Sequence, residues 1–277
     1  MEMTLANSRS QPVCHDKSLP GLPLKTWIVI PTYNEAENLP LLFKSLFELP
    51  LDDLTILIVD DNSPDGTGKL AEELGRKYKN RVRCLHRAGK LGLGTAYIEG
   101  FQYALREGAE AICQMDADFS HPLETIPLMS RLSSEFDLVI GSRYVAGGAL
   151  DERWPAWRKF LSGFGNTYAR TILRLPVHDA TGGFRFWRRA TLAGMPLERV
   201  KSNGYVFQVE MVYLARLLGF NMIETPIYFA DRRFGKSKMS LRIQFEAAFR
   251  VWQVRWHYRD LRAKGETGRM EIERRPR

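Results

Sequence analysis

The stretch Leu54–Thr67, which reads LTILIVDDNSPDGT, shows the pattern that decides the fold. Its residues up to Val59 are apolar apart from Thr55 and rich in β-branched side chains, as in a strand that is buried on both faces. Residues 60–67 are acidic and turn-forming, and residues 68–79 have a helical pattern. The stretch therefore predicts one strand–loop–helix unit of an α/β protein.

The same alternation recurs along the chain. Further buried strands are predicted at residues 27–30, 82–85, 111–113, 137–141 and 223–229, and further helices at 39–47, 95–106, 157–173 and 205–218. Strands that alternate with helices form a mostly parallel sheet. We predict an α/β fold with a mostly parallel, Rossmann-like sheet covered by helices on both faces, in a single domain followed by a C-terminal amphipathic helix.

The positive charge is unevenly placed. The 277-residue chain has a net charge of +8, yet Arg232–Arg277 contains 14 basic and 5 acidic residues, against 26 and 27 in the rest. The basic character therefore belongs to the C-terminal segment. It predicts contact with an anionic surface, which leaves phospholipid, nucleic acid and an anionic substrate as alternatives.

Three segments follow from composition. Residues 1–25 are polar and proline-containing and lack the apolar core of a signal peptide, so we expect a flexible N-terminal segment. Residues 26–230 form the predicted domain, and residues 231–277 form a basic loop, an amphipathic helix and a flexible tail. No apolar run approaches the ~20 residues that span a bilayer, so we expect no transmembrane segment.

The stretch QMDADFSH, residues 114–121, places two carboxylates where a buried strand should end. Asp116 and Asp118 are two residues apart, so in a strand they point to the same side. They could hold a divalent cation, act as a general acid/base pair, or lie in a solvated turn. Ligands of open α/β sheets bind beyond the carboxyl ends of the strands. A nucleotide diphosphate bridged by Mg²⁺ or Mn²⁺ suits the acidic loops predicted there.

Four motifs occur in order, namely PTYNE at 31–35, DDNSPDGT at 60–67, DAD at 116–118 and GSRY at 141–144. In this set the chain resembles the family 2 inverting glycosyltransferases, which have the GT-A fold. It looks most like the polyprenyl-phosphate (dolichol-phosphate) mannose synthases among them. That narrower likeness rests on KLGLG at 90–94, Arg158 with Ser162, TGGFR at 181–185, and Arg232 before GKSK at 235–238. The resemblance covers about residues 26–242.

The resemblance implies a role for each matching residue. Those expected to bind the nucleotide sugar are Pro31, Tyr33, Glu35, Val59, Asp61, Lys90, Asp116, Ala117, Asp118, Ser120, Arg232 and Lys238. Asp116 and Asp118 are the expected metal ligands. The acceptor phosphate is expected to lie against Arg143, Arg158, Ser162 and Arg232. Ser120 stands where some relatives carry Gln, which leaves the third metal ligand open.

The function implied is inverting transfer of mannose from GDP-mannose to a polyprenyl phosphate. An acceptor phosphate is already anionic at pH 7, so it needs positioning rather than a base, and Asp118, Arg143 and Arg158 are the expected catalytic residues. A related enzyme that uses UDP-glucose or a sugar acceptor is one alternative. A non-catalytic polyanion-binding protein is another, but no nucleic-acid-binding module is recognisable, so no nucleic-acid partner is expected.

The C-terminal helix carries aromatic and basic residues at helical spacing. Phe245, Phe249, Trp252 and Trp256 recur along it, with arginines between them. This pattern fits an interfacial membrane helix, and it also fits a helix packed on the domain with a solvated basic face. A lipid acceptor favours the membrane. We therefore expect a cytoplasmic protein that associates peripherally with the cytoplasmic face of a membrane.

Overall fold

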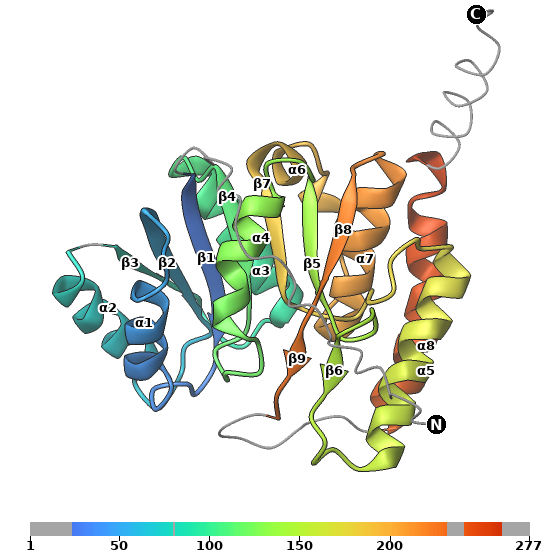
Figure 1. Ribbon diagram of the computed structural model, residues 1–277, viewed down its shortest axis with the longest axis horizontal. Helices are drawn as coiled ribbons and strands as arrows, with labels where there is room; N and C mark the ends of the chain where they lie inside the picture. Colours follow the sequence, from blue (N-terminus) through green and yellow to red (C-terminus); the bar gives the residue numbers. More distant parts are fainter. Residues whose placement is uncertain (1–23, 80, 232–240, 262–277) are drawn as a thin grey trace, which may run out of the picture.

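The computed structural model describes residues 24–79, 81–231 and 241–261, with the backbone alone for residues 241–247 (Figure 1). Arg232 and Lys238, two of the expected ligand-binding residues, lie outside the described residues. Among the described residues, no helix is long and apolar enough to cross a membrane.

One seven-stranded sheet forms the centre of the domain, in the order β3-β2-β1-β4-β7-β5-β8. All neighbouring strands are parallel except β7, which is antiparallel to both β4 and β5. The strands are β1 (Lys25–Thr32), β2 (Asp53–Asp60), β3 (Val82–His86), β4 (Ala111–Gln114), β5 (Leu138–Ser142), β7 (Arg185–Arg188) and β8 (Met222–Pro226). The prediction of a mostly parallel α/β sheet is therefore confirmed.

Helices cover both faces of the sheet because successive strand side chains point to opposite sides. Val29 and Val59 belong to the core under α3 (Leu93–Arg106), α5 (Ala156–Leu173), α6 (Arg189–Ala193), α7 (Gly204–Leu217) and α8 (Leu241–His257). Ile30 and Ile58 belong to the opposite core, under α1 (Leu39–Phe47), α2 (Thr67–Lys77) and α4 (Ile126–Leu132). Two short 3₁₀ helices, Leu123–Thr125 and Leu197–Arg199, complete the helical elements described.

The reversed strand β7 matters for the site. The parallel strands all end at one edge of the sheet, and β7 begins there because it runs the other way. The turn before β7 therefore joins the loops that follow the parallel strands. The expected strand at 223–229 is divided into two strands. The first, β8, pairs with β5 as far as Pro226, and the second, β9 (Tyr228–Phe229), pairs with β6 (Ala149–Leu150) in a second small sheet.

Helix α8 lies beside α5, as the red and yellow-green ribbons in Figure 1 show, and it also contacts α7. Val251, Val254 and Tyr258 are buried against the domain, whereas the aromatic residues Phe249, Trp252 and Trp256 are exposed. The predicted helix exists and packs on the domain, but the face it turns to solvent is aromatic as well as basic.

Gly100 allows α3 to approach the sheet. A Cβ at this residue would lie 2.5 Å from Val29 Cγ1 and 2.9 Å from Val59 Cγ2. We expect Gly100→Ala to lower the free energy of unfolding by about 1–3 kcal/mol through overpacking, measured by urea denaturation. The matched control is Gly163→Ala in α5, where a Cβ meets nothing within 4 Å. This control should leave stability unchanged or raise it by up to about 1 kcal/mol, and equal effects of the two changes would contradict the packing argument.

Candidate active site

Two of the predicted loops are joined by hydrogen bonds at the carboxyl edge of the sheet. The backbone N–H groups of Asn34 and Glu35 donate to Ser63 Oγ (3.1 Å) and Thr67 Oγ1 (2.9 Å), and that of Ala36 donates to Asp65 Oδ2 (3.1 Å). The motifs PTYNE and DDNSPDGT therefore form one unit, in which the hydroxyl and carboxyl groups of the second loop satisfy the backbone of the first.

Within this unit, the Asp61 carboxylate is paired with the buried guanidinium group of Arg87. Arg87 Nη1 donates to Asp61 Oδ1, and the two side chains are 1% and 9% exposed. Arg87 Nη2 donates to Thr95 Oγ1 (2.6 Å) and Glu99 Oε1 (3.1 Å) on α3. Burial raises the pKa of Asp61 and Arg87 only partly offsets this effect, so the pKa is above its ordinary value. Arg87 thus ties the end of β2 to α3.

Tyr33 and Lys90 face each other across this edge, with Lys90 Nζ 3.9 Å from the centre of the Tyr33 ring. They come from the loops after β1 and β3, so the fold brings these two predicted nucleotide-binding residues together. The side chain of Val59 is fully buried in the core beneath α3. Any contact of Val59 with a ligand would therefore use its backbone.

The carboxylates of the DAD motif are each oriented by a hydroxyl group. Tyr97 of α3 donates to Asp116 Oδ1 (3.1 Å), and Ser120 donates to Asp118 Oδ1 through both its hydroxyl (2.6 Å) and its backbone N–H (3.1 Å). Phe119 between them has φ = 60°, an uncommon conformation for a bulky residue. The Ser120 hydroxyl therefore orients Asp118 in this structure.

These supports fit a divalent metal ion, because carboxylate ligands of metals are usually oriented by hydrogen bonds from neighbouring groups. Within the described part of the chain, no group of three or more His, Cys, Asp or Glu side chains is placed to hold a metal. Ligand oxygens and water would complete the coordination that Asp116 and Asp118 begin. His121 is buried and its Nδ1 accepts from the Asp116 N–H (3.2 Å). Burial lowers its pKa, so His121 is a neutral supporting residue.

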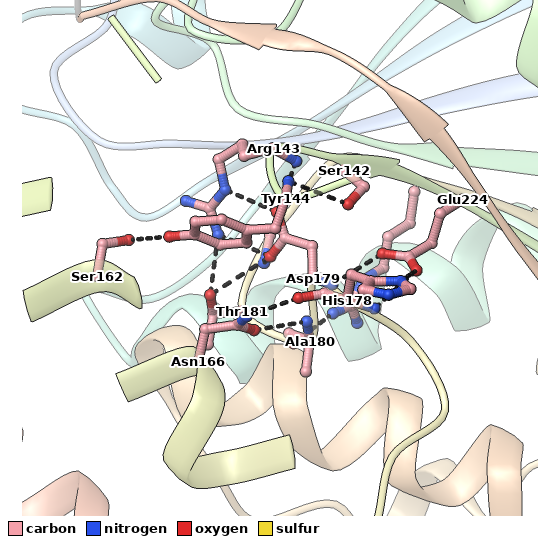
Figure 2. A network of polar contacts seen from close by, with 12 residues as sticks. Ser142, Arg143, Tyr144, Ser162, Asn166, His178, Asp179, Ala180, Thr181 and Glu224 are labelled. Atoms are coloured by element: carbon pink, nitrogen blue, oxygen red, sulfur yellow. Dashed lines mark hydrogen bonds and ion pairs between the residues drawn. The ribbon is translucent and has the colours of Figure 1, made fainter. Parts of the chain in front are cut away.

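Arg143 is held by a buried carboxylate on the turn before β7 (Figure 2). Its Nε and Nη2 donate to Asp179 Oδ2 (2.7 Å) and Oδ1 (2.8 Å), and its backbone N–H donates to Asp179 Oδ2 (3.0 Å). Burial raises the pKa of Asp179, but the charge and hydrogen bonds of Arg143 outweigh it and hold the pKa below its ordinary value. Glu224 of β8 in turn accepts from the backbone N–H of Asp179 (2.8 Å).

Helix α5 is attached to this pair at two points (Figure 2). Ser162 Oγ is hydrogen-bonded to Tyr144 Oη (2.8 Å), next to Arg143 in the chain. Asn166, one turn further along α5, donates to the His178 carbonyl (2.6 Å) and accepts from the Ala180 N–H (2.9 Å). The fold therefore brings Ser162 and Arg143, both predicted to hold the acceptor phosphate, into one network.

Arg158 reaches the same region through aromatic contacts. Its guanidinium lies 3.5 Å from the Trp154 ring, which packs edge-on against Phe229. Phe229 also lies 5.3 Å from the Arg143 guanidinium. Arg158 Nη1 donates to Asp231 Oδ1 (3.2 Å). The two predicted phosphate-binding arginines thus flank one aromatic pair.

Several residues at this edge of the sheet were not predicted from the sequence to belong to the site. They are Arg87, Tyr97, Trp154, Asp179 and Asp231, and each supports a predicted site residue through a contact described above. Asp179 lies two residues before the Thr-Gly-Gly turn and Asp231 directly precedes Arg232, so these two adjoin predicted motifs. The others lie on helices or between motifs, where their contacts depend on tertiary structure.

Comparison with known proteins agrees with this geometry. The family model described as "Glycosyl transferase family 2" matches residues 27–193, so the chain belongs to the family 2 glycosyltransferases. The chain is 43% identical to a polyprenol monophosphomannose synthase of Mycolicibacterium smegmatis, over 91% of this chain and 96% of that protein. It is 42% identical to an undecaprenyl-phosphate mannosyltransferase of Micrococcus luteus, over 87% of this chain and 99% of that protein.

Solved structures share the fold. The mannosyltransferase PcManGT of Pyrobaculum calidifontis, in complex with GDP-Man and Mn²⁺, has a TM-score of 0.54 and 16% identity, over 82% of this chain and 62% of that one. Glucosyl-3-phosphoglycerate synthase of Mycobacterium tuberculosis with UDP has a TM-score of 0.59 and 16% identity, over 86% of this chain and 80% of that one. The GT-A-like fold predicted from the sequence is confirmed.

The Arg143–Asp179 pair gives a stability prediction. Asp179→Asn leaves a buried guanidinium without its counter-charge, so we expect a loss of about 3–5 kcal/mol in the free energy of unfolding at pH 7. Because the folded pKa of Asp179 is depressed, its contribution is present above about pH 4 and is lost as the pH falls further. Urea denaturation from pH 7 to pH 3 should show a shallower acid dependence in the variant.

The control for this prediction is Glu72→Gln, which removes an exposed pair with His86. It should change the free energy of unfolding by less than about 1 kcal/mol. An Asp179→Asn protein as stable as this control would show that the pair contributes nothing to folding.

Proposed function

We propose that this protein transfers mannose from GDP-mannose to a polyprenyl phosphate with inversion at the anomeric carbon. The observation that carries the proposal is the arrangement along one sheet edge. The joined loops after β1 and β2, an oriented carboxylate pair and two arginines follow one another there. The two relatives that match nearly their full length are named for mannose and polyprenyl-phosphate chemistry, which supports both substrate classes.

The nucleotide side would be formed by the loops after β1, β2 and β3. Asp61 is an acceptor for base N–H groups, and guanine offers two neighbouring donors of this kind. Arg87 keeps that carboxylate oriented. Pro31, Tyr33 and Glu35 would line this side together with Lys90, whose ammonium group lies over the Tyr33 ring and would supply positive charge to the donor diphosphate.

Asp116 and Asp118 would hold Mg²⁺ or Mn²⁺ beside Ala117 and the donor diphosphate. When bound, the ion would offset negative charge that develops on the departing diphosphate. Tyr97 and Ser120 keep the two carboxylates in place, so little reorganisation is needed when substrate binds.

The acceptor phosphate would lie against Arg143, Arg158 and Ser162. A guanidinium group pairs well with phosphate oxygens, and Arg143 uses Nε and Nη2 on Asp179, which leaves Nη1 for a ligand. An acceptor oxygen would then form the new bond to the anomeric carbon while the bond to the GDP β-phosphate breaks, and GDP leaves with the electron pair. The phosphate is anionic, so no protein base is required. Arg232 remains a proposed contributor to both the donor and the acceptor side, and Lys238 to the donor side.

The test is mannose transfer with purified protein, GDP-mannose and a polyprenyl phosphate, with Mn²⁺ or with EDTA. We expect lipid-linked mannose only with the metal, and a rate lowered about a hundredfold or more in Asp118→Ala. Asp53→Asn is the matched control, because Asp53 begins β2 at the opposite end of the sheet. Transfer from UDP-glucose in preference to GDP-mannose would overturn the donor assignment, and full metal-dependent activity of Asp118→Ala would overturn the metal site.

We further propose that an aromatic face of α5 and α8 binds the cytoplasmic surface of a membrane. This face consists of the exposed side chains Trp157, Phe160, Phe164, Phe249, Trp252 and Trp256. Phe160 stacks on Phe164 and Phe164 on Tyr168, whose hydroxyl accepts from Trp252 Nε1 (3.0 Å). Contacts from Phe160 through Phe164 and Tyr168 to Trp252 thus join the two helices, and α8 also carries Arg250 and Arg255. Exposed aromatic residues with nearby arginines are typical of interfacial helices.

Vesicle flotation tests the membrane proposal. Replacing Phe160 and Trp252 by Ser should reduce binding to anionic phospholipid vesicles at least about tenfold, because each removes a large apolar side chain from the interface. Leu128→Ser is the matched control, since Leu128 is exposed on α4 over the opposite face of the sheet. Equal binding by the double variant and the wild type would contradict the proposal.

A further inference from the structure

Asp231 lies two residues after β9 and is bonded to two side chains of the acceptor side. Its Oδ1 accepts from Trp154 Nε1 (3.0 Å) and from Arg158 Nη1 (3.2 Å). Trp154 and Arg158 are themselves stacked, with the guanidinium 3.5 Å from the ring. The carboxylate therefore touches the arginine that is proposed to bind the acceptor phosphate.

The position of this carboxylate is set independently of Arg158. The Asp231 N–H donates to Asp151 Oδ2 (2.8 Å), and the Asp151 N–H donates to the Phe229 carbonyl (3.0 Å). Pairing of β6 with β9 holds the two chain segments together, and Asp151 is itself buried. Asp231 thus stays in place whether or not Arg158 remains bonded to it.

The Arg158–Asp231 pair is weaker than the Arg143–Asp179 pair. Arg143 and Asp179 make a two-pronged, buried contact at 2.7 and 2.8 Å. Arg158 contributes a single nitrogen at 3.2 Å, and the side chains of Arg158 and Asp231 are 23% and 38% exposed. A single-pronged, partly exposed pair contributes little net free energy, whereas a phosphate can engage a guanidinium through two oxygens. Arg158 is therefore the arginine that can exchange partners.

We propose that Asp231 is a positioning residue that competes with the acceptor phosphate for Arg158. This inference rests on the proposed function, in which Arg158 binds that phosphate. Without acceptor, Asp231 and Trp154 keep the guanidinium at the site entrance in one orientation. A phosphate monoester carries up to two negative charges near pH 7 and displaces Asp231.

The competition has a consequence for the product. Transfer of a sugar converts the phosphate monoester into a diester, which carries one negative charge. The weaker charge holds Arg158 less firmly, so Asp231 regains the guanidinium and the product is released more readily. Asp231 thereby lowers the affinity for substrate and product alike, and it prevents the product from occupying the site.

Asp231→Asn tests this competition, because the amide oxygen can still accept from Trp154 Nε1 while the charge is removed. We expect the KM for a short-chain isoprenyl phosphate to fall about two- to fivefold, as for loss of a partly exposed ion pair. The inhibition constant of the mannosylated product should also fall, and the Kd for GDP should not change. A merely structural anchor would give the opposite sign, namely a higher KM. A KM that rises or stays constant overturns the inference.

Two further variants separate the explanations. In an Arg158→Gln background, Asp231→Asn should no longer change the KM, and an effect that persists there overturns the inference alone. If Arg158→Gln by itself leaves the KM for the isoprenyl phosphate unchanged, the proposed acceptor site fails and this inference fails with it. Asp231→Ser should reproduce the sign of Asp231→Asn, with folding of both checked by thermal unfolding. Asp260→Asn, which removes a surface pair with Arg199, is the matched control and should leave the KM unchanged.

Discussion

The buried pair between Arg143 and Asp179 is the contact on which the acceptor half of the site depends. Asp179 precedes β7, the one strand of the main sheet that runs against its neighbours, and Arg143 follows β5, which pairs with β7. The ion pair closes the gap between these two chain segments. It also extends to α5, since Tyr144 next to Arg143 is bonded to Ser162, and Asn166 is bonded to the backbone on either side of Asp179. A buried ion pair costs desolvation and is maintained only with good geometry, and here three hydrogen bonds from Arg143 supply it.

The rigid Arg143–Asp179 pair contrasts with the looser Arg158–Asp231 pair, and under the proposed function the two arginines would have different roles. Arg143 is fixed by burial and by two side-chain hydrogen bonds to Asp179, so it could set the position of an acceptor phosphate. Arg158 makes one hydrogen bond to Asp231, of 3.2 Å, and stacks on the Trp154 ring. Its guanidinium could therefore turn to a phosphate that binds and return to Asp231 when the phosphate leaves. The donor half shows the same division. Asp61 is held by Arg87, and Asp116 and Asp118 are oriented by Tyr97 and Ser120, whereas Lys90 lies over the half-buried Tyr33 ring. Under the proposed function, the site would combine fixed groups that set the geometry with cationic groups that meet the charged ligand.

The sequence predicted most of the fold because its signals are local. Apolar runs such as residues 54–59 and the turn-forming residues after them define strand–loop–helix units without knowledge of their neighbours. The reversal of β7 could not be predicted in this way, since nothing in residues 185–188 records the direction of the adjacent strands. Motif residues such as Asp118 and Ser162 lie in the networks at the carboxyl edge of the sheet, and their roles toward a ligand stay predictions. Their partners Arg87, Tyr97 and Asp231 were missed, because each acts through a contact between segments far apart in the chain. Ser120 could be listed from its motif, but only the geometry shows that its hydroxyl serves Asp118.

Helix α5 connects the two surfaces that a lipid acceptor would need. Arg158, Ser162 and Asn166 are spaced by four residues and face the site, while Trp157, Phe160 and Phe164 form a second stripe that faces solvent. A helix is about 10 Å across with its side chains, so the aromatic stripe and the phosphate-binding stripe are separated by little more than that width. An aromatic face that rests in the headgroup region would hold the arginines at the depth of lipid phosphates. The acceptor could then present its phosphate to Arg143 and Arg158 while its apolar chain stays in the membrane. Burial on α8 fits the same arrangement. Val251 and Val254 fix the helix to the domain, where it contacts α5 and α7, whereas Phe249, Trp252 and Trp256 are exposed and would be available to a lipid surface.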